Sequence, residues 1–553
     1  MRQNHGTTGV WSWAGRPLAV LLCLLLGLPL AACAMPGRVT WPTGTGQAAA
    51  ITRLTEATAV PAAASGDLRL WWPPPRSLNP LSAETAAEKA VYDLVYEGLC
   101  RIEADDSVSW QLAENLLVFT GGRQGLVALG QDVAFHDGSP VTAGDVAQVM
   151  TYILDPANLS PWREGLEHVV GVRALNDQVL EILLAEPDPW LAWALTFPVI
   201  PADHLAVPPF TPIPGTGPYA IQRFDPDQGL TLIRQETAAG EAGLSQIQVK
   251  SYADQREAMK ALERDELDLV LLDGQALPLY TVRTSLRLDR YAGQELIMFL
   301  CQDQGKRPLN DPALRTRVKQ EIEAWSASPA LPAWIAAGTL GFAAGSYLTR
   351  SDVQPASPGS ILAGLTAADP AEVKPLQLIV PVQDARRVDL ANEAASALEA
   401  AGLACEVTPL EPEPFWQALQ EGRYDLALLA AVLPDKPCPG LLIRPERPAS
   451  FADLDSLATA QGGLADYETW RDRFLALAAA PQRDYSRAEQ LAQDWQEALN
   501  ETMARSNWSI VGFSCHGLAY GSRVLGQLRP NRYHPYDGIK ELWIWSSPSS
   551  SSY

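Results

Sequence analysis

The feature that most constrains the fold of this 553-residue chain is a stretch that occurs twice. The sequence KALERDELDLVLLDG, residues 260–274, aligns without gaps to QALQEGRYDLALLAA, residues 417–431. Each copy has the pattern of a helix end, a polar turn and an apolar strand, and each follows another predicted strand. Strand–helix–strand units form right-handed crossovers in largely parallel sheets that helices cover. The repeat therefore predicts an α/β protein with two similar halves. The alternative is that a common type of buried strand recurs by chance.

The ends of these strands indicate where a ligand would bind. Parallel α/β sheets bind ligands at the carboxyl ends of their strands, here in a cleft between the two halves. Asp273 follows the first repeated strand and Ala431 ends the second, so both are candidate ligand-binding residues. Trp71 and Trp72 end a third strand, DLRL, just before three prolines. At least one of the two is expected to face the cleft, and core packing is the equal alternative.

The N-terminus predicts export. An apolar run from Leu18 to Leu30 follows two arginines, is short for a membrane span and is typical of a secretory signal, residues 1–32. It ends in LAAC, which resembles a bacterial lipobox and predicts a lipid on the sulfur of Cys33. The alternative is an ordinary signal peptide. Both interpretations place the protein outside the cytoplasm, and the first anchors it to a bacterial membrane, in the periplasm or on the outer face of the cell membrane.

Composition indicates how the remainder is organised and which partners to expect. Residues 33–66 are rich in Ala, Thr, Gly and Pro and predict a flexible linker, and residues 546–553 predict a disordered tail. The 64 acidic and 42 basic residues give a net charge of −22 without a long basic run, so a nucleic-acid partner is not expected. The cysteines beyond Cys33 are widely spaced. They allow one unassigned disulfide and show no zinc-binding spacing, so neither a metal nor a cofactor is expected: Cys100, Cys301, Cys405, Cys438 and Cys515.

Two groups of residues invite an enzymatic interpretation, and both have a simpler one. His136 and Asp137 lie in a turn before a helix whose predicted capping box pairs Thr142 with Asp145, so they are interpreted as turn residues. In the strand VGFSCHGL, residues 511–518, serine, cysteine and histidine are direct neighbours, which is the wrong geometry for a catalytic triad. HExxH and Walker motifs are also absent from the sequence. No catalytic residue is predicted, and a secreted hydrolase remains only an alternative.

Six short motifs occur in a characteristic order. They are SLNP at 77–80, VYDLVYEGL at 91–99, FHDGSPVTAGDV at 135–146, LDP at 154–156, GTGPY at 215–219 and YDLALL at 424–429. In this order they resemble the family 5 bacterial extracellular solute-binding proteins, which include the oligopeptide-, dipeptide- and nickel-binding components of ABC importers. The resemblance covers about residues 68–545 and is strongest as far as residue 219.

The resemblance implies a two-lobed periplasmic-binding-protein-like fold of type II, with an extra inserted domain and a hinge between the lobes. Lobe I would comprise residues 67–84, 187–294 and 507–545. The small inserted domain would comprise 85–186, and lobe II 295–506.

The resemblance also implies a function. The chain would be the substrate-binding lipoprotein of an ABC importer, a monomer that captures a small solute, first of all a peptide, between its lobes. It would deliver this solute to a membrane permease with its ATPase. The alternatives are a sugar or a metal chelate as ligand, and a sensor or chaperone with the same fold.

One departure from the family pattern bears on the ligand. Peptide-binding members hold the α-amino group with the carboxylate of a Trp-x-x-Asp segment after the strand that corresponds to residues 424–429. Here Ala431 stands near the tryptophan position, and Asp435 is the nearest carboxylate, offset by about one residue. Asp435 is therefore a candidate ligand-binding residue, with a solvated loop acid as the alternative.

Overall fold

The computed structural model describes eleven stretches of the chain, all within one compact unit, Ala57–Tyr553. They are residues 67–119, 122–188, 190–235, 244–281, 286–303, 305–339, 342–343, 346, 374–433, 483–484 and 507–545. The predicted signal, Cys33, the linker, Asp435 and the tail lie outside the described residues. Within the described part, no helix is long and apolar enough to cross a membrane.

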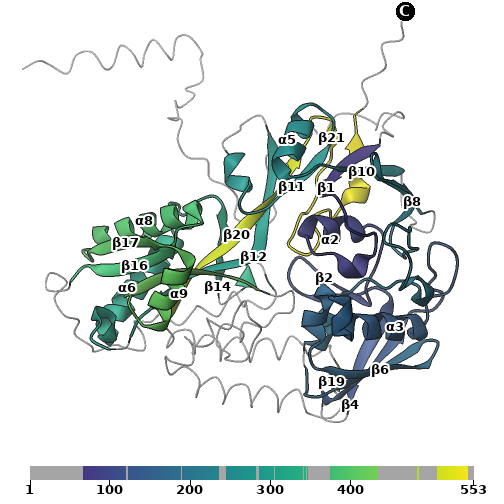
Figure 1. Ribbon diagram of the computed structural model, residues 1–553, viewed down its shortest axis with the longest axis horizontal. Coiled ribbons are helices and arrows are strands. Elements are labelled where there is room, and N and C mark those ends of the chain that lie inside the picture. Colours follow the sequence, from purple (N-terminus) through teal and green to yellow (C-terminus); the bar gives the residue numbers. More distant parts are fainter. Residues whose placement is uncertain are drawn as a thin grey trace, which may run out of the picture. The chain divides into compact units, whose positions relative to one another are not determined.

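The largest sheet of the described structure is mixed and has eleven strands, several of which are labelled in Figure 1. Ten of its strands follow one path from edge to edge, and β13 (Ile335–Ala336) pairs with β20 beside it. In order, the ten are β17 (Cys405–Leu410), β16 (Leu376–Pro381), β18 (Leu426–Val432), β12 (Arg287–Cys301), β20 (Trp508–Tyr520), β11 (Leu269–Leu272), β1 (Leu68–Trp72), β10 (Gln246–Ser251), β9 (Gly229–Arg234) and β8 (Tyr219–Asp225).

The repeated sequence forms two equivalent parts of this sheet. β10, β1 and β11 are mutually parallel in one part, and β17, β16 and β18 are parallel in the other. The crossover helices are α5 (Gln255–Glu263) and α9 (Pro412–Gln420), and α8 (Ala385–Ala400) links β16 to β17. The parallel crossovers predicted from the sequence are confirmed. The sequence suggested separate sheets, whereas the two parts are joined by the antiparallel strands β12 and β20.

The two copies share their turn geometry. Each crossover helix ends before a residue in the left-handed conformation, Asp265 in the first copy (φ 55°) and Gly422 in the second (φ 65°). The next strand then starts at a buried aspartate that exchanges hydrogen bonds with the neighbouring parallel strand. Asp268 accepts from the backbone N–H of Arg69 at 2.8 Å, and Asp425 accepts from that of Gln377 at 2.8 Å. The repeat is therefore structural and not a chance recurrence of strand composition.

The joining strands β12 and β20 are the longest in the sheet. β12 pairs with β18 on one side and β20 on the other, and β20 continues to pair with β11. The register between β12 and β20 shifts between Ala292 and Leu296. A bulge of this kind bends and twists the strands locally. It falls at the predicted lobe boundary, 294/295, although the division into lobes stays a prediction.

A second, five-stranded sheet is built mainly from strands between Ala113 and Leu184, and the bounds 85–186 of an inserted domain stay a prediction. Its strand order is β19 (Arg483–Asp484), β4 (Ala113–Phe119), β5 (Gln124–Leu129), β7 (Val179–Leu184) and β6 (Val169–Asn176). Helix α3 (Ala143–Leu154) packs against this sheet and starts with the predicted Thr142–Asp145 capping box. Helix α2 (Ala86–Tyr92), the hairpin of β2 (Cys100–Ile102) with β3 (Val108–Trp110), and the 3-10 turn η4 (Pro161–Leu166) connect this region to the larger sheet.

The remaining elements are short or cover the two ends of the large sheet. They are α4 (Leu191–Ala194), α6 (Pro312–Ser326), the hairpins β14 (Gly338–Thr339) with β15 (Phe342–Ala343) and β21 (Val524–Leu525) with β22 (Trp543–Ile544), and the 3-10 turns η1 (Pro80–Ser82), η3 (Pro156–Asn158), η5 (Ala202–His204), η6 (Leu277–Leu279), η7 (Pro308–Asn310) and η11 (Ile539–Glu541). The described cysteines are free, buried thiols: Cys100, Cys301, Cys405 and Cys515. Cys438 lies outside the described residues.

Candidate functional site

Four of the sequence motifs converge around one segment, residues 92–96. The ring of His136, from the FHDG motif, is hydrogen-bonded at both nitrogens to the GTGPY segment. Its Nδ1 accepts from the N–H of Gly215 at 3.2 Å, and its Nε2 donates to the carbonyl of Gly217 at 2.9 Å. Gly217 in turn donates to Val95 O at 2.9 Å. His136 is therefore a structural turn residue, as the sequence predicted.

The SLNP motif completes this arrangement. The hydroxyl of Tyr92 donates to Ser77 O at 2.7 Å, which fixes the end of α2. The carbonyl of Pro80 accepts from the indole N–H of Trp162 at 3.3 Å, and Leu81 O accepts from the hydroxyl of Ser160 at 2.7 Å. Motifs far apart in the sequence thus hold α2 and η4 beside each other.

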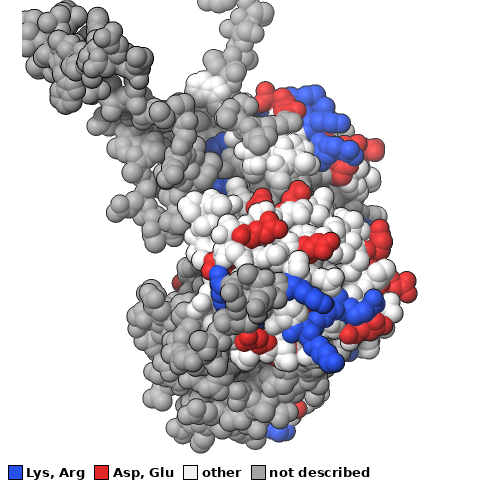
Figure 2. All heavy atoms as spheres, turned by 90° about the vertical axis from the view of Figure 1, so that its left-hand side faces the viewer, with Lys and Arg blue, Asp and Glu red and all other residues white. Residues whose placement is uncertain are grey.

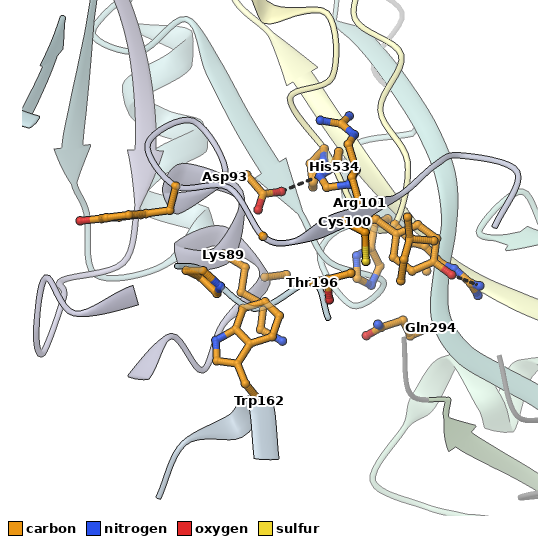
Figure 3. A pocket seen from close by; sticks show the side chains of 18 of the residues that line it. Lys89, Asp93, Cys100, Arg101, Trp162, Thr196, Gln294 and His534 are labelled. Atoms are coloured by element: carbon orange, nitrogen blue, oxygen red, sulfur yellow. Dashed lines mark hydrogen bonds and ion pairs between the residues drawn. The ribbon is translucent and has the colours of Figure 1, made fainter. Parts of the chain in front are cut away.

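A pocket with a volume of about 170 Å³ opens beside α2 and η4 (Figure 3). Its wall includes residues of α2 and β2, η4, β12 and β20, together with Gln111, Thr196, Pro198 and residues 532–535. Lys89 and Trp162 contribute one side, and Gln294 of β12 lies across the pocket from them. Residues separated by more than 400 positions therefore meet in one cavity.

Three basic side chains of this wall contact a carboxylate. Arg101 contacts Asp537 at 2.9 Å. The other two pairs are Arg532 with Asp106 at 2.5 Å and His534 Nδ1 with Asp93 at 2.7 Å. The Arg532–Asp106 pair is almost entirely buried and is joined by the hydroxyl of Tyr533, which donates to the same carboxylate at 2.7 Å. These contacts shape the pocket, and the charges of Arg101 and Arg532 are compensated.

The bulged side of the pocket is uncharged near neutral pH. Burial lowers the pKa of His516, with Asp273 and Glu295 acting in the opposite direction. Burial also raises the pKa of Tyr291, whose ring meets the imidazole of His516 edge-on at 5.8 Å. A Cβ at Gly293 would lie 2.8 Å from this imidazole, so only glycine lets β12 pass so close to β20 here.

The tryptophans that were predicted to face a cleft belong to the core. Trp71 donates its indole N–H to Tyr252 O at 3.1 Å and is 4% exposed. Trp72 is fully buried, with its ring edge-on to Tyr92 at 6.1 Å. Neither lines the pocket. β1 lies between two other strands and beneath α2, so the end of this strand is covered.

The other predicted site residues also lie outside the pocket wall. The carboxylate of Asp273 accepts from the N–H groups of Gln275 and Ala276, at 2.9 and 2.8 Å, and so caps a turn. Ala431 is buried in β18, where it pairs with Leu296 of β12. Asp435 lies outside the described residues. Ligand contact by these residues stays a prediction.

The sequence argument against a catalytic serine rests on the direct adjacency of Ser514, Cys515 and His516. Ser514 is buried, and its hydroxyl has no hydrogen-bond partner within the described part of the chain. It therefore does not donate to His516. Among the described residues, no group of three or more His, Cys, Asp or Glu side chains could hold a metal ion.

Sequence reasoning missed the residues that do line the pocket, Lys89, Trp162, Gln294 and His516. Lys89 lies two residues before the 91–99 motif, and Trp162 lies six residues after the LDP motif. His516 lies within the strand of residues 511–518, where it was considered only as a member of a catalytic triad. The motifs were interpreted as fold signatures, so Lys89 and Trp162 were not considered.

One family model matches part of the chain. The model for "Bacterial extracellular solute-binding proteins, family 5 Middle" matches residues 108–319. The nickel-binding periplasmic protein of Escherichia coli is 27% identical over 48% of this chain and 53% of its own length. The oligopeptide-binding protein OppA of Bacillus subtilis is 28% identical over 22% of this chain and 25% of its own. The chain thus matches between a quarter and about half of the length of these relatives.

Solved structures of similar fold cover most of this chain. The murein tripeptide-binding protein MppA in its unliganded open form has a TM-score of 0.68 at 16% identity, with 87% of this chain and 98% of that chain covered. A nickel ABC transporter protein from Bacillus halodurans has a TM-score of 0.67 at 17% identity, with 86% and 99% covered. The two-lobed periplasmic-binding-protein-like fold expected from the sequence is confirmed.

Proposed function

Because this chain belongs to the family 5 bacterial extracellular solute-binding proteins, we propose that it captures a small solute in the pocket beside α2 and delivers it to an ABC permease. The solute proposed first is a short peptide. Capture is non-enzymatic binding, and export and anchoring through Cys33 would keep the protein at the membrane that holds the permease.

The observation that carries this proposal is the composition of the pocket wall. The bulge of β12, with Gly293 and Gln294, lines the pocket, and β12 and β20 join the two halves of the large sheet. A ligand in the pocket therefore contacts the strands on which the relative arrangement of the halves depends. It shifts that arrangement in proportion to its differential affinity for the two states. Through this change in arrangement, a permease would distinguish the liganded protein from the unliganded one.

The bulge also supports a peptide as ligand. The register between β12 and β20 shifts between Ala292 and Leu296, and on the other side Leu433 donates to Gln294 O at 2.9 Å. Gly293 and Gln294 thus border the pocket at an irregular point of the ladder. Main-chain hydrogen bonds bind peptides with an affinity largely independent of side chains.

The test is identification of the bound solute. The signal-less protein, purified from cells grown in rich medium, would be analysed by native mass spectrometry and again after denaturing release. We expect a heterogeneous set of short peptides. Addition of a binding peptide at about 100 times its Kd is expected to raise the free energy of unfolding by about 2.7 kcal/mol. A protein that carries no solute, and that no peptide or metal complex stabilises, would contradict the proposal.

A metal chelate is the second candidate ligand. The longest stretch of sequence similarity reported above is to a nickel-binding periplasmic protein. In the native mass spectrum, a chelate would give one discrete added mass with the isotope pattern of its metal. That result would replace the peptide as ligand and leave solute capture in place.

A further inference from the structure

Lys89 differs from the other cations that line the pocket. It lies on α2, within the part of the helix that the Thr85–Glu88 capping box fixes. Its Nζ is 5.0 Å from the centre of the Trp162 ring. Within the described part of the chain, no carboxylate oxygen lies within 4 Å of this ammonium group. Lys89 therefore brings an uncompensated positive charge to the wall of the pocket.

The other charged side chains around the pocket differ from Lys89 in their contacts. Arg101, Arg532 and His534 each contact a carboxylate, as described above. Of the two acidic residues of the wall, Asp93 is engaged by His534, and Glu84 is exposed at the rim with Arg76 at 3.5 Å. On the face drawn in Figure 2, groups of basic side chains likewise lie beside acidic ones.

Trp162 gives the ammonium group a rigid neighbour. The hydrogen bond from its indole N–H to Pro80 O fixes the ring, and the bond from Ser160 to Leu81 O fixes the turn that carries it. A cation over an indole face is attracted by the ring but gains no hydrogen-bond acceptor from it. The ammonium hydrogens therefore remain available to an acceptor in the pocket, beside an apolar ring that excludes water from one side.

We propose that Lys89 and Trp162 form a subsite for an anionic group, and that the solute is a small molecule with a carboxylate there. This inference rests on the proposed function and specifies the ligand class. A chain with a net charge of −22 repels anions at long range, so an anionic solute needs a local cation of this kind. Both the C-terminus of a peptide and a carboxylate chelator supply the required group.

The test compares ligands that carry a carboxylate with ligands that lack one. Calorimetry would measure the Kd of tri-alanine and of tri-alanine amide, and of Ni²⁺ complexed by citrate and by ethylenediamine. We expect the wild-type protein to prefer the carboxylate member of at least one pair by about ten- to a hundredfold, the effect of a charge-assisted hydrogen bond. The pair that shows the preference identifies the source of the carboxylate.

Variants then assign the preference to Lys89. Lys89→Met keeps the apolar stem over Trp162 and should abolish the preference, whereas Lys89→Arg should retain much of it. Lys260→Met is the matched control, since it removes one positive charge from an exposed position on α5 outside the pocket wall. It should leave the preference unchanged. Thermal unfolding of each variant verifies that the fold is intact.

The outcomes separate this inference from the proposed function. Equal affinity of the wild-type protein for both members of each pair, or a preference that survives in Lys89→Met, would overturn the anionic subsite while solute capture stands. If the wild-type protein binds none of the four probes and co-purifies with no solute, solute capture itself fails, and the subsite with it.

Discussion

The imidazole of His136 joins two segments by accepting a hydrogen bond at one ring nitrogen and donating one at the other. Nδ1 accepts from Gly215, and Nε2 donates to Gly217. This arrangement requires the neutral tautomer with its proton on Nε2, because a proton on Nδ1 would face the N–H of Gly215. Burial lowers the pKa of His136 from its ordinary value of 6.5, against the opposing effects of Gly217 and Asp137.

The first prediction concerns this histidine and pH. Because its pKa is lower in the folded protein than in the unfolded chain, its contribution to stability is present above about pH 6.5 and is lost as the pH falls below that value. Urea unfolding at about pH 7.5 and pH 5 should show a smaller loss of stability in His136→Gln than in the wild-type protein. His516 titrates in both proteins, so its effect cancels in the comparison. Parallel pH dependences would contradict this role.

The second prediction concerns the close approach of Gly215 to the chain. A Cβ at this position would lie 2.0 Å from Val95 O, and backbone cannot move aside as a side chain can. Gly215→Ala should therefore lower the free energy of unfolding by about 3 kcal/mol. Gly171→Ala is the control, because a Cβ there meets only side-chain atoms of Leu183 at ordinary distances, 3.6 Å or more. Similar urea midpoints for both variants would show that the loop can shift at little cost.

At the level of elements, the two copies of the repeat have the same backbone but differ in how their aspartates are compensated. Asp268 forms a bidentate ion pair with the guanidinium of Arg69, at 2.9 and 2.8 Å. Among the described residues, the basic side chain that contacts Asp425 is Arg307, at 3.6 Å. Burial raises the pKa of Asp425, with Gln377 and Arg307 opposing this effect. In both copies the aspartate accepts a hydrogen bond from the backbone of the neighbouring strand. The bidentate ion pair described above belongs to Asp268 of the first copy.

The third prediction follows from this difference. Asp268→Asn breaks a buried ion pair and leaves Arg69 without its partner, so we expect a loss of about 3 kcal/mol. Asp425→Asn keeps an oxygen for the N–H of Gln377 and removes a charge that burial already disfavours. Its cost at pH 7 should be below about 1 kcal/mol. Chemical denaturation of both variants measures the difference, and equal losses would show that the two aspartates are equivalent.

The elements also show what the sequence could predict. A single sequence shows local periodicity and turn chemistry. These signals were sufficient to predict the crossover strands, the N-terminal cap of α3 and the turn role of His136. The pocket depends on contacts between residues such as Lys89, Trp162 and Gln294, whose separation along the chain hides their proximity. Trp72 lies at a strand end, as expected, but α2 covers that end, and this tertiary arrangement carries no local signal.

At the scale of the whole molecule, anchoring depends on Cys33, which lies outside the described residues. If Cys33 carries a lipid, Cys33→Ser should move the protein from the detergent-extracted membrane fraction to the soluble fraction. Cys23→Ser, within the same predicted signal, should leave it in the membrane fraction. Fractionation with immunodetection measures both variants. A wild-type protein found only in the soluble fraction would contradict the anchor and favour an ordinary signal peptide.

The position of β20 has a consequence for how the molecule is made. β20 is the only described strand that connects β12 to β11, and it follows β12 by more than 200 positions along the sequence. During synthesis, the two halves of the sheet therefore remain without their connecting strand until β20 has left the ribosome. Pairing over such sequence separations is slow to form. If the chain is exported, as its N-terminus predicts, this delay keeps the sheet incomplete while the polypeptide enters a translocation channel.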